Sequence, residues 1–202
     1  MSDRIFIPSG KIELEGLFDR RDPKRAGVVA HPHPLYGGSM HNHVVQAAAE
    51  GLIQAGWTSL RFNFRGVGRS TGAHGQGLGE QEDLAAAASF LKEWAEEVLV
   101  VGYSFGAWVA AFAWPRLHEL GVLPLALIAP PAVFMNFDEL PPETQVGLIV
   151  CGQFDDIGPP DLAAGLGKHL KTQIEPIIIP ESDHFFGGRE TEISRIIAEY
   201  LK

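Results

Sequence analysis

Short apolar runs alternate with segments of helical periodicity along this sequence, and the alternation limits the folds that the chain can adopt. Most of the apolar runs are continuous, as in strands that are buried on both faces of a sheet. Strands that alternate with helices form βαβ units, in which a parallel sheet is covered on both faces. The predicted strands are residues 27–30, 58–64, 98–101, 123–128, 146–150 and 174–179, and the predicted helices are residues 44–55, 80–97, 105–114, 161–170 and 190–201.

Two segments at the start of the chain differ from this pattern. Residues 4–8 and 11–18 alternate partly between apolar and polar side chains, and Ser9-Gly10 between them is a turn sequence. We therefore expect an antiparallel hairpin before the parallel strands. Together the segments predict an α/β fold with a mostly parallel, doubly wound sheet of about eight strands and helices on both faces. The length of 202 residues predicts a single domain over residues 1–202.

Composition and charge exclude several classes of protein. The net charge of −9 is unfavourable for binding nucleic acid, because phosphate binding needs a basic surface. The single cysteine, Cys151, excludes an intrachain disulfide framework and fits a reducing compartment. The uncharged stretches 98–114 and 120–137 are interrupted by glycines or prolines, whereas a membrane helix needs about 20 apolar residues. We expect a cytoplasmic protein that has neither a nucleic-acid nor a membrane partner.

One predicted strand ends in Gly102-Tyr103-Ser104-Phe105-Gly106, directly before a predicted helix. A Gly-x-Ser-x-Gly pattern in this setting is typical of a sharp turn that raises a nucleophilic serine above the sheet. The small glycines let strand and helix approach each other, and the N-terminus of the helix favours negative charge. The motif predicts Ser104 as a nucleophile and the Phe105 N–H as a donor to an oxyanion.

Two further strand ends carry residues that can complete a catalytic triad. Asp155 and Asp156 follow the strand at 146–150, and His184 follows the strand at 174–179. The carboxyl ends of parallel strands meet at one edge of the sheet, so these side chains are expected near the serine. A histidine there can take the proton of the serine, and an acid can orient the imidazole. The residues alone leave Asp155 and Asp156 as alternatives for the acid.

The loop after the first parallel strand, residues 31–38, is the expected source of a second oxyanion donor. It reads His-Pro-His-Pro-Leu-Tyr-Gly-Gly, and its prolines have no N–H. Early in the loop, after His31, the N–H groups of His33 and Leu35 are the candidates. We favour Leu35, because it follows both prolines and leads into the two glycines. The imidazoles of His31 and His33 are expected to shape the loop through hydrogen bonds.

Half of the eight histidines lie within residues 31–43, so a metal-binding protein is one alternative function. However, no carboxylate is spaced with these histidines as a ligand, and the sequence contains no HExxH motif. We expect neither a metal nor a cofactor. A second alternative is a non-catalytic binding protein with the same fold, because a fold does not fix a function.

Taken together, these motifs resemble the small lidless bacterial serine hydrolases of the α/β-hydrolase family. That group typically carries an HPHP-x-x-GG loop, an RFNFRGVGxS segment, and G-x-S-x-G, G-x-x-D and D-H-F-F motifs. All five occur here, the second as residues 61–70, and the resemblance covers nearly the whole chain. It implies the α/β-hydrolase fold, with Ser104 as nucleophile, His184 as base, and Asp155 rather than Asp156 as acid.

The resemblance also sets expectations for the substrate. The related dienelactone-hydrolase-like group commonly uses a cysteine nucleophile, so the serine argues against a dienelactone substrate. Only residues 129–145 separate the two strands between which this fold inserts a lid, too few for a cap domain. We therefore predict an open site that cleaves an ester or thioester of a small acyl substrate through an acyl-enzyme, and an open apolar face that permits a homo-oligomer. Four apolar residues are candidates for the pocket wall: Val133, Phe134, Met135 and Phe137.

Overall fold

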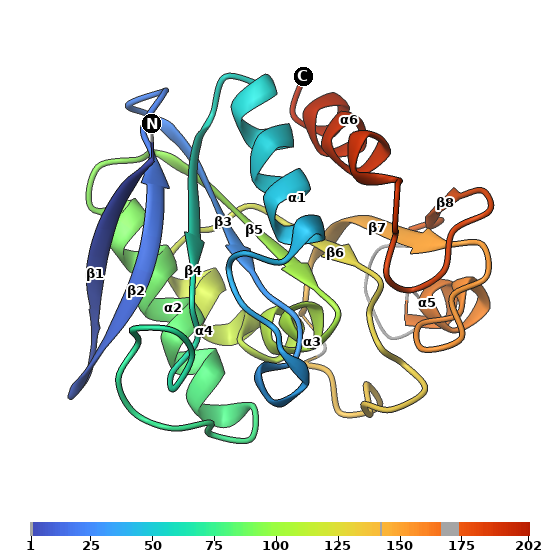
Figure 1. Ribbon diagram of the computed structural model, residues 1–202, viewed down its shortest axis with the longest axis horizontal. Coiled ribbons are helices and arrows are strands. Elements are labelled where there is room, and N and C mark those ends of the chain that lie inside the picture. The colour runs from blue at the N-terminus through green and yellow to red at the C-terminus, as the bar shows by residue number, and fades with distance from the viewer. Residues whose placement is uncertain (1, 142, 167–173) are drawn as a thin grey trace.

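The computed structural model describes residues 2–141, 143–166 and 174–202, and these residues contain eight strands. The strands are β1 (Asp3–Ser9), β2 (Ile12–Asp19), β3 (Arg25–Ala30), β4 (Thr58–Phe62), β5 (Glu97–Tyr103), β6 (Leu125–Ile128), β7 (Val146–Gly152) and β8 (Ile177–Ile179). They form one sheet in the order β1-β2-β4-β3-β5-β6-β7-β8 (Figure 1). The pairs β1/β2 and β2/β4 are antiparallel, and the other neighbours are parallel. The predicted mixed sheet with an antiparallel hairpin at its start is confirmed.

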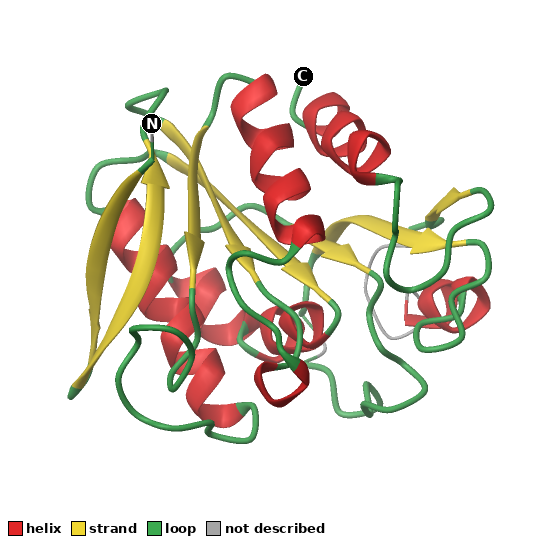
Figure 2. Ribbon diagram, in the orientation of Figure 1, coloured by secondary structure: helices red, strands yellow, loops and turns green. Residues whose placement is uncertain are grey.

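Helices cover both faces of the sheet (Figure 2). They are the 3₁₀ helix η1 (Pro34–Tyr36) and the α-helices α1 (His43–Gln54), α2 (Leu78–Lys92), α3 (Phe105–Phe112), α4 (Trp114–Glu119), α5 (Pro160–Leu166) and α6 (Glu190–Tyr200). Helices α1 and α6 pack against each other on one face, and α2, α3, α4 and α5 pack on the other. Two separate hydrophobic cores result, one on each side of the sheet.

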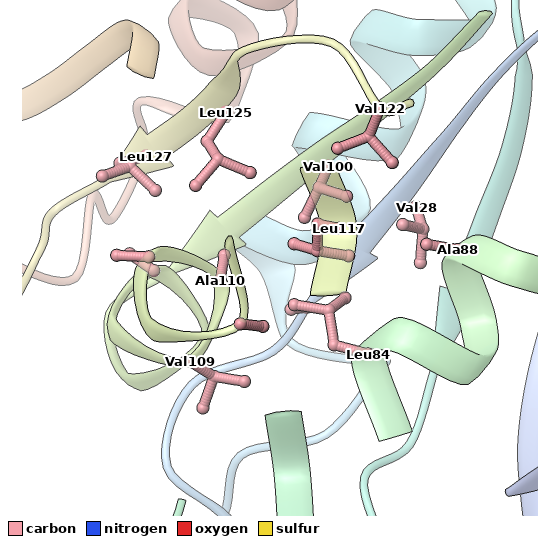
Figure 3. Packing of buried hydrophobic residues seen from close by; sticks show 14 of the residues in the cluster. Val28, Leu84, Ala88, Val100, Val109, Ala110, Leu117, Val122, Leu125 and Leu127 are labelled. Atoms are coloured by element: carbon pink, nitrogen blue, oxygen red, sulfur yellow. The ribbon is translucent and has the colours of Figure 1, made fainter. Parts of the chain in front are cut away.

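Strand β5 shows why its apolar run is continuous. Successive side chains of a strand point to opposite faces, so a strand between two helix layers needs apolar residues at every position. Val98 and Val100 belong to the core beneath α2, α3 and α4, part of which Figure 3 shows. Leu99 and Val101 belong to the core beneath α1 and α6, and all four side chains are fully buried.

Several predicted helix ends are wrong by a few residues, for local reasons. Helix α2 starts at Leu78 rather than at Glu80, because the Glu80 carboxylate accepts the N–H of Gly77 and caps the helix earlier. It ends at Lys92, and Glu97 belongs to β5 instead, where its N–H bonds to the carbonyl of Lys24. The predicted helix 161–170 is described only to residue 166, and the rest lies outside the described residues.

The predicted helix 105–114 divides in two, and Pro115 is the reason. Proline has no N–H, so it cannot continue the hydrogen-bond ladder of α3. Helix α4 therefore begins anew at Trp114 with Pro115 in its first turn, where no N–H is needed. The segment between β6 and β7 has no helix in its described residues, 129–141 and 143–145, consistent with the predicted lack of a cap. Within the described residues, no helix has both the length and the apolar character required to cross a membrane.

Candidate active site

Ser104 occupies a sharp turn between β5 and α3. Its φ of 53° lies in the left-handed region, which non-glycine residues rarely adopt, so the backbone is strained at this position. The flanking glycines are required by close backbone contacts. A Cβ atom on Gly102 would collide with the carbonyl of Gly106, and one on Gly106 would collide with the carbonyl of Ala30. The Gly-x-Ser-x-Gly pattern therefore reflects the approach of α3 to β3 and β5.

The loops after β7 and β8 bring two of the predicted site residues to Ser104. His184 Nε2 lies 2.9 Å from Ser104 Oγ. On the other side of the ring, His184 Nδ1 lies 2.9 Å from Asp155 Oδ2 and 3.0 Å from Asp155 Oδ1. Both His184 and Asp155 are buried. The three side chains form one continuous line of hydrogen bonds from the acid to the serine.

The structure places Asp155, and not Asp156, against the histidine. Asp155 Oδ1 also accepts the backbone N–H groups of Ile157, at 2.9 Å, and Gly158, at 2.7 Å. These bonds fix the orientation of the carboxylate toward the histidine. The proton of His184 is therefore assigned to Nδ1, which donates to Asp155, so that Nε2 can accept from Ser104. Asp156 is exposed to solvent.

Neighbouring residues fix the position of the histidine loop. The Tyr103 hydroxyl donates to the carbonyl of His184 at 3.1 Å. Burial, reinforced by the Asp155 and Asp183 carboxylates, raises the pKa of Tyr103, so the hydroxyl keeps its proton. One residue further, His43 Nε2 lies 2.7 Å from the carbonyl of Phe185. The backbone at the histidine and at the residue that follows it is thus tied to the rest of the fold.

The two N–H groups that were predicted to bind an oxyanion differ in whether they already donate a hydrogen bond within the described residues. The Phe105 N–H stands at the N-terminus of α3, and no acceptor for it is found within the described residues. The Leu35 N–H, in contrast, donates to the imidazole Nδ1 of His33 at 3.2 Å. The His33 N–H has no acceptor within the same part of the chain, and the His33 ring packs on Phe105 at 4.6 Å between centroids. Leu35 thus stays a prediction as oxyanion donor, and the N–H of His33, the other candidate in this loop, is the one without an acceptor within the described residues.

The buried His31 side chain holds this loop in place through hydrogen bonds to the backbone. It is fully buried, and burial lowers its pKa to about 4, so the imidazole is neutral at neutral pH. Its Nδ1 lies 2.6 Å from the carbonyl of Pro32, and its Nε2 accepts the N–H of Phe64 at 3.0 Å. Both ring nitrogens are therefore used by the backbone. Among the described residues, no group of three or more histidine, cysteine or acidic side chains is arranged to hold a metal.

The segment from residue 61 to residue 70 had no predicted role beyond the resemblance. Its side chains link elements that lie around the site. Asn63 Oδ1 accepts the N–H of Met40 at 2.8 Å, and Asn63 Nδ2 donates to the buried Glu15 at 3.0 Å. This amide links the strand β2 to the loop after β3. Arg65 donates to the buried carboxylate of Asp83 on α2, with a shortest distance of 2.8 Å.

A second pair of histidine and carboxylate also escaped the sequence analysis. His74 Nδ1 lies 2.8 Å from Glu80 Oε1, although the angle does not suit a hydrogen bond. The Glu80 side chain is fully buried and accepts the N–H groups of Gly75, at 2.8 Å, and Gly77, at 2.7 Å. The His74 ring contacts those of His33 and Phe105, with centroids 5.1 Å and 5.9 Å away. The only sequence signal for this pair was a histidine six residues before a glutamate at the start of a predicted helix.

One cavity lies away from this site. It has a volume of about 550 Å³ and is formed by α1, the start of α6 and strand β4. Arg61, Glu50 and Glu190 are among its lining residues, and no member of the Ser104 site lines it. We therefore assign it no part in the chemistry of Ser104.

A mostly parallel sheet with a strained serine between β5 and α3 defines the α/β-hydrolase class. A serine hydrolase homologue from Coxiella burnetii superposes with a TM-score of 0.87 and 30% identity over 99% of this chain and 97% of that one. A serine hydrolase without a lid from Xanthomonas campestris superposes with a TM-score of 0.84. Its sequence is 32% identical, and the match covers 99% of this chain and 93% of that one. An uncharacterized protein of Rickettsia prowazekii is 37% identical over 96% of this chain and 85% of its own length. No family model matches the sequence.

These similarities extend over nearly the full length of each solved structure. The chain belongs to the family of small α/β serine hydrolases that lack a lid.

Proposed function

We propose that the protein hydrolyses an ester or thioester bond of a small-molecule substrate, with Ser104 as nucleophile, His184 as general base and acid, and Asp155 as the orienting acid. The observation that carries this proposal is the unbroken series of hydrogen bonds from Asp155 through His184 to Ser104. Three loops that are distant in sequence supply these side chains. Membership of the serine hydrolase family supports the same assignment.

The first half of the reaction forms an acyl-enzyme. Ser104 Oγ attacks the carbonyl carbon of the substrate and gives its proton to His184 Nε2. Asp155 stabilises the resulting imidazolium through Nδ1. The carbonyl oxygen becomes negative and accepts the N–H of Phe105 and, we propose, the N–H of His33 in place of Leu35. The bond to the leaving alcohol or thiol then breaks, and His184 returns the proton to that group.

The second half of the reaction releases the acid. A water molecule gives a proton to His184 and attacks the carbonyl carbon of the acyl-enzyme. The tetrahedral intermediate is stabilised by the same two N–H groups. The bond from the carbon to Ser104 Oγ breaks, His184 protonates that oxygen, and the carboxylic acid leaves. A burst of leaving group, followed by slower turnover, is the expected kinetic pattern when the second half is slower.

Labelling with a fluorophosphonate probe tests the assignment of the nucleophile. The probe should form one adduct, located on Ser104 by mass spectrometry, and the Ser104→Ala variant should not react. Because Ser104 is only partly buried and carries no structural side-chain cap, the variant is expected to fold normally. A folded wild-type protein that does not react, or that reacts at another serine, would overturn the proposal.

A further inference from the structure

Six large apolar side chains are exposed on the loops at the carboxyl ends of the strands. Their exposed fractions range from 50% to 88%, although such residues are usually placed in the core. We refer to this set as the apolar rim: Leu35, Tyr36, Val133, Phe134, Phe154 and Phe185. Four of the six lie on the loops after β6, β7 and β8, and two lie on the loop after β3.

The loops that carry the apolar rim follow the carboxyl ends of the strands, and Ser104 lies at the carboxyl end of β5. Phe185 follows His184 directly, and the centroids of the two rings are 5.6 Å apart. Phe154 precedes Asp155 in the chain. The N–H of Val133 donates to the carbonyl of Ile157 at 3.1 Å, so the loop after β6 adjoins the acid loop.

On the opposite side of the nucleophile, the loop after β3 completes the rim. The ring of Tyr36 lies 5.0 Å from that of His33, which in turn packs on Phe105, the residue after Ser104. Of the pocket-wall candidates, Phe137 is buried in the core, and Val133 and Phe134 belong to the exposed rim. Several large apolar side chains that are exposed on loops beside a reactive group are a mark of ligand binding.

Three of the four loops that carry the rim are acidic, and the fourth, residues 31–42, contains no aspartate, glutamate, lysine or arginine. Residues 31–42, 129–145, 153–159 and 180–189 contain seven aspartates and glutamates but only one lysine or arginine. That residue, Arg189, is placed 3.3 Å from Glu181 and 3.5 Å from Glu192, so its charge is balanced. Asp138, Asp156 and Asp183 are exposed.

Other groups near the site do not offset these carboxylates. Arg65 is held by Asp83 and Glu82. Burial, together with the neighbouring His74, lowers the pKa of His33, which favours its neutral form. His74 itself faces the carboxylate of Glu80. A substrate that approaches Ser104 therefore meets an apolar surface within a field of negative charge.

We infer that the apolar rim selects uncharged esters with a large apolar acyl group and discriminates against substrates that carry anionic groups, including thioesters of polyphosphorylated carriers. This inference rests on the proposed function, because the rim can choose among substrates only if Ser104 reacts with them. Contact with the rim removes apolar substrate surface from water. The surrounding carboxylates repel an anion, and the repulsion weakens as salt screens it.

Matched substrates can separate charge from shape. We expect the 4-nitrophenyl monoester of adipic acid, which carries a terminal carboxylate, to have a kcat/KM about tenfold below that of its methyl ester at low salt. The difference should shrink as salt rises from ~10 mM to ~150 mM, since the Debye length falls from about 30 Å to about 8 Å. The S-hexanoyl thioester of N-acetylcysteamine should likewise be cleaved faster than hexanoyl-coenzyme A.

Matched variants test which surface is responsible. Phe134→Ser should lower the preference for 4-nitrophenyl hexanoate over the acetate several-fold, whereas Phe6→Ser, at an exposed phenylalanine on β1, should not change it. Asp156→Lys should raise kcat/KM for the anionic adipate ester relative to the methyl ester. Glu119→Lys, which makes the same charge change on α4, should not.

Three outcomes would overturn the inference. The first is equal kcat/KM for the anionic and neutral esters at low salt. The second is an unchanged acyl preference in Phe134→Ser. The third is a dimer that dissociates in Phe134→Ser, because the rim would then be covered by a second copy of the chain. Fluorophosphonate labelling of the same samples separates failure of this inference from failure of the proposed function. If only the inference is wrong, the probe still labels Ser104; if the proposed function is wrong, it does not.

Discussion

The Asp155–His184 pair and the Glu80–His74 pair both consist of a carboxylate and an imidazole, but different groups surround the two imidazoles. Each has a buried carboxylate that accepts two backbone N–H groups, and each faces an imidazole Nδ1 at less than 3.0 Å. Only His184 has a hydroxyl at its other ring nitrogen. Among the described residues, no serine, threonine or cysteine side chain hydrogen-bonds to His74.

The two pairs differ in how the carboxylate meets the histidine. The Asp155 carboxylate forms hydrogen bonds to His184 with suitable geometry and so fixes the tautomer and the direction of the ring. The Glu80 carboxylate uses its oxygens mainly on the N–H groups of Gly75 and Gly77, where it starts α2. We therefore propose a catalytic role for the Asp155–His184 pair and a structural role for the Glu80–His74 pair, beside the loop of residues 31–38.

Exchange of each histidine for glutamine tests this division most directly. His184→Gln removes the proposed base of Ser104, and we expect turnover of a neutral aryl ester to fall by about 10⁴-fold or more. His74→Gln should lower kcat by less than about tenfold, because no proton transfer passes through it. Initial rates with purified, folded variants provide the measurement.

Equal losses in the two histidine variants would contradict the division and would place His74 in the reaction. Circular dichroism and fluorophosphonate labelling distinguish the causes. A His74→Gln protein that is folded but unreactive toward the probe would show that the second pair controls the nucleophile.

A second test concerns the choice between adjacent acids. Asp155→Asn should lower kcat by about 10⁴-fold, because an amide cannot stabilise the imidazolium and favours the wrong tautomer of His184. Asp156→Asn should change kcat by no more than about twofold, as is usual for an exposed side chain away from special contacts. Steady-state kinetics on the same neutral ester compare the two. A larger loss in Asp156→Asn would refute the assignment of Asp155.

The sequence allowed the sheet, the hairpin and the turn at Ser104 to be predicted because these depend on local patterns. Continuous apolar runs identify strands that are buried on both faces, and the glycines around Ser104 reflect contacts within a few residues. The positions of His184 and the aspartates followed from the rule that strand ends meet at one edge. The residues alone did not separate Asp155 from Asp156, and the resemblance made that choice.

The remaining features depend on where long loops return to the fold. The link between Arg65 and Asp83 joins residues 18 positions apart, and the contact of Asn63 with Glu15 joins residues 48 positions apart. The preference for Leu35 was reasonable from the prolines alone. It could not take into account that the His33 imidazole caps η1 and accepts the Leu35 N–H, because no periodicity reveals this contact.

The smallest expected effect concerns stability in the second pair. Glu80→Gln keeps the size of the side chain but replaces the ionised acceptor of two N–H groups, so we expect a loss of about 1–3 kcal/mol in the free energy of unfolding. Urea denaturation at pH 7 measures this loss. Glu82→Gln, at an exposed neighbour on the same helix, should change the free energy of unfolding by no more than about 0.5 kcal/mol.

The pH dependence of the stability difference between wild type and Glu80→Gln tests whether the charge of Glu80 is its cause. Burial alone would raise the pKa of Glu80, but the hydrogen bonds from Gly75, Gly77 and its own N–H lower the pKa below the ordinary value of 4.5. A carboxylate with a lowered pKa stabilises the fold fully above the pKa of the unfolded chain, and this contribution is lost as the pH falls through the folded pKa. Wild type and Glu80→Gln should therefore differ most near neutral pH and converge as the pH falls below 4.5 and through the lowered pKa of Glu80 in the folded protein. A difference that stayed constant into acid would mean that the charge of Glu80 does not stabilise the start of α2, and that the packing of the side chain is what matters.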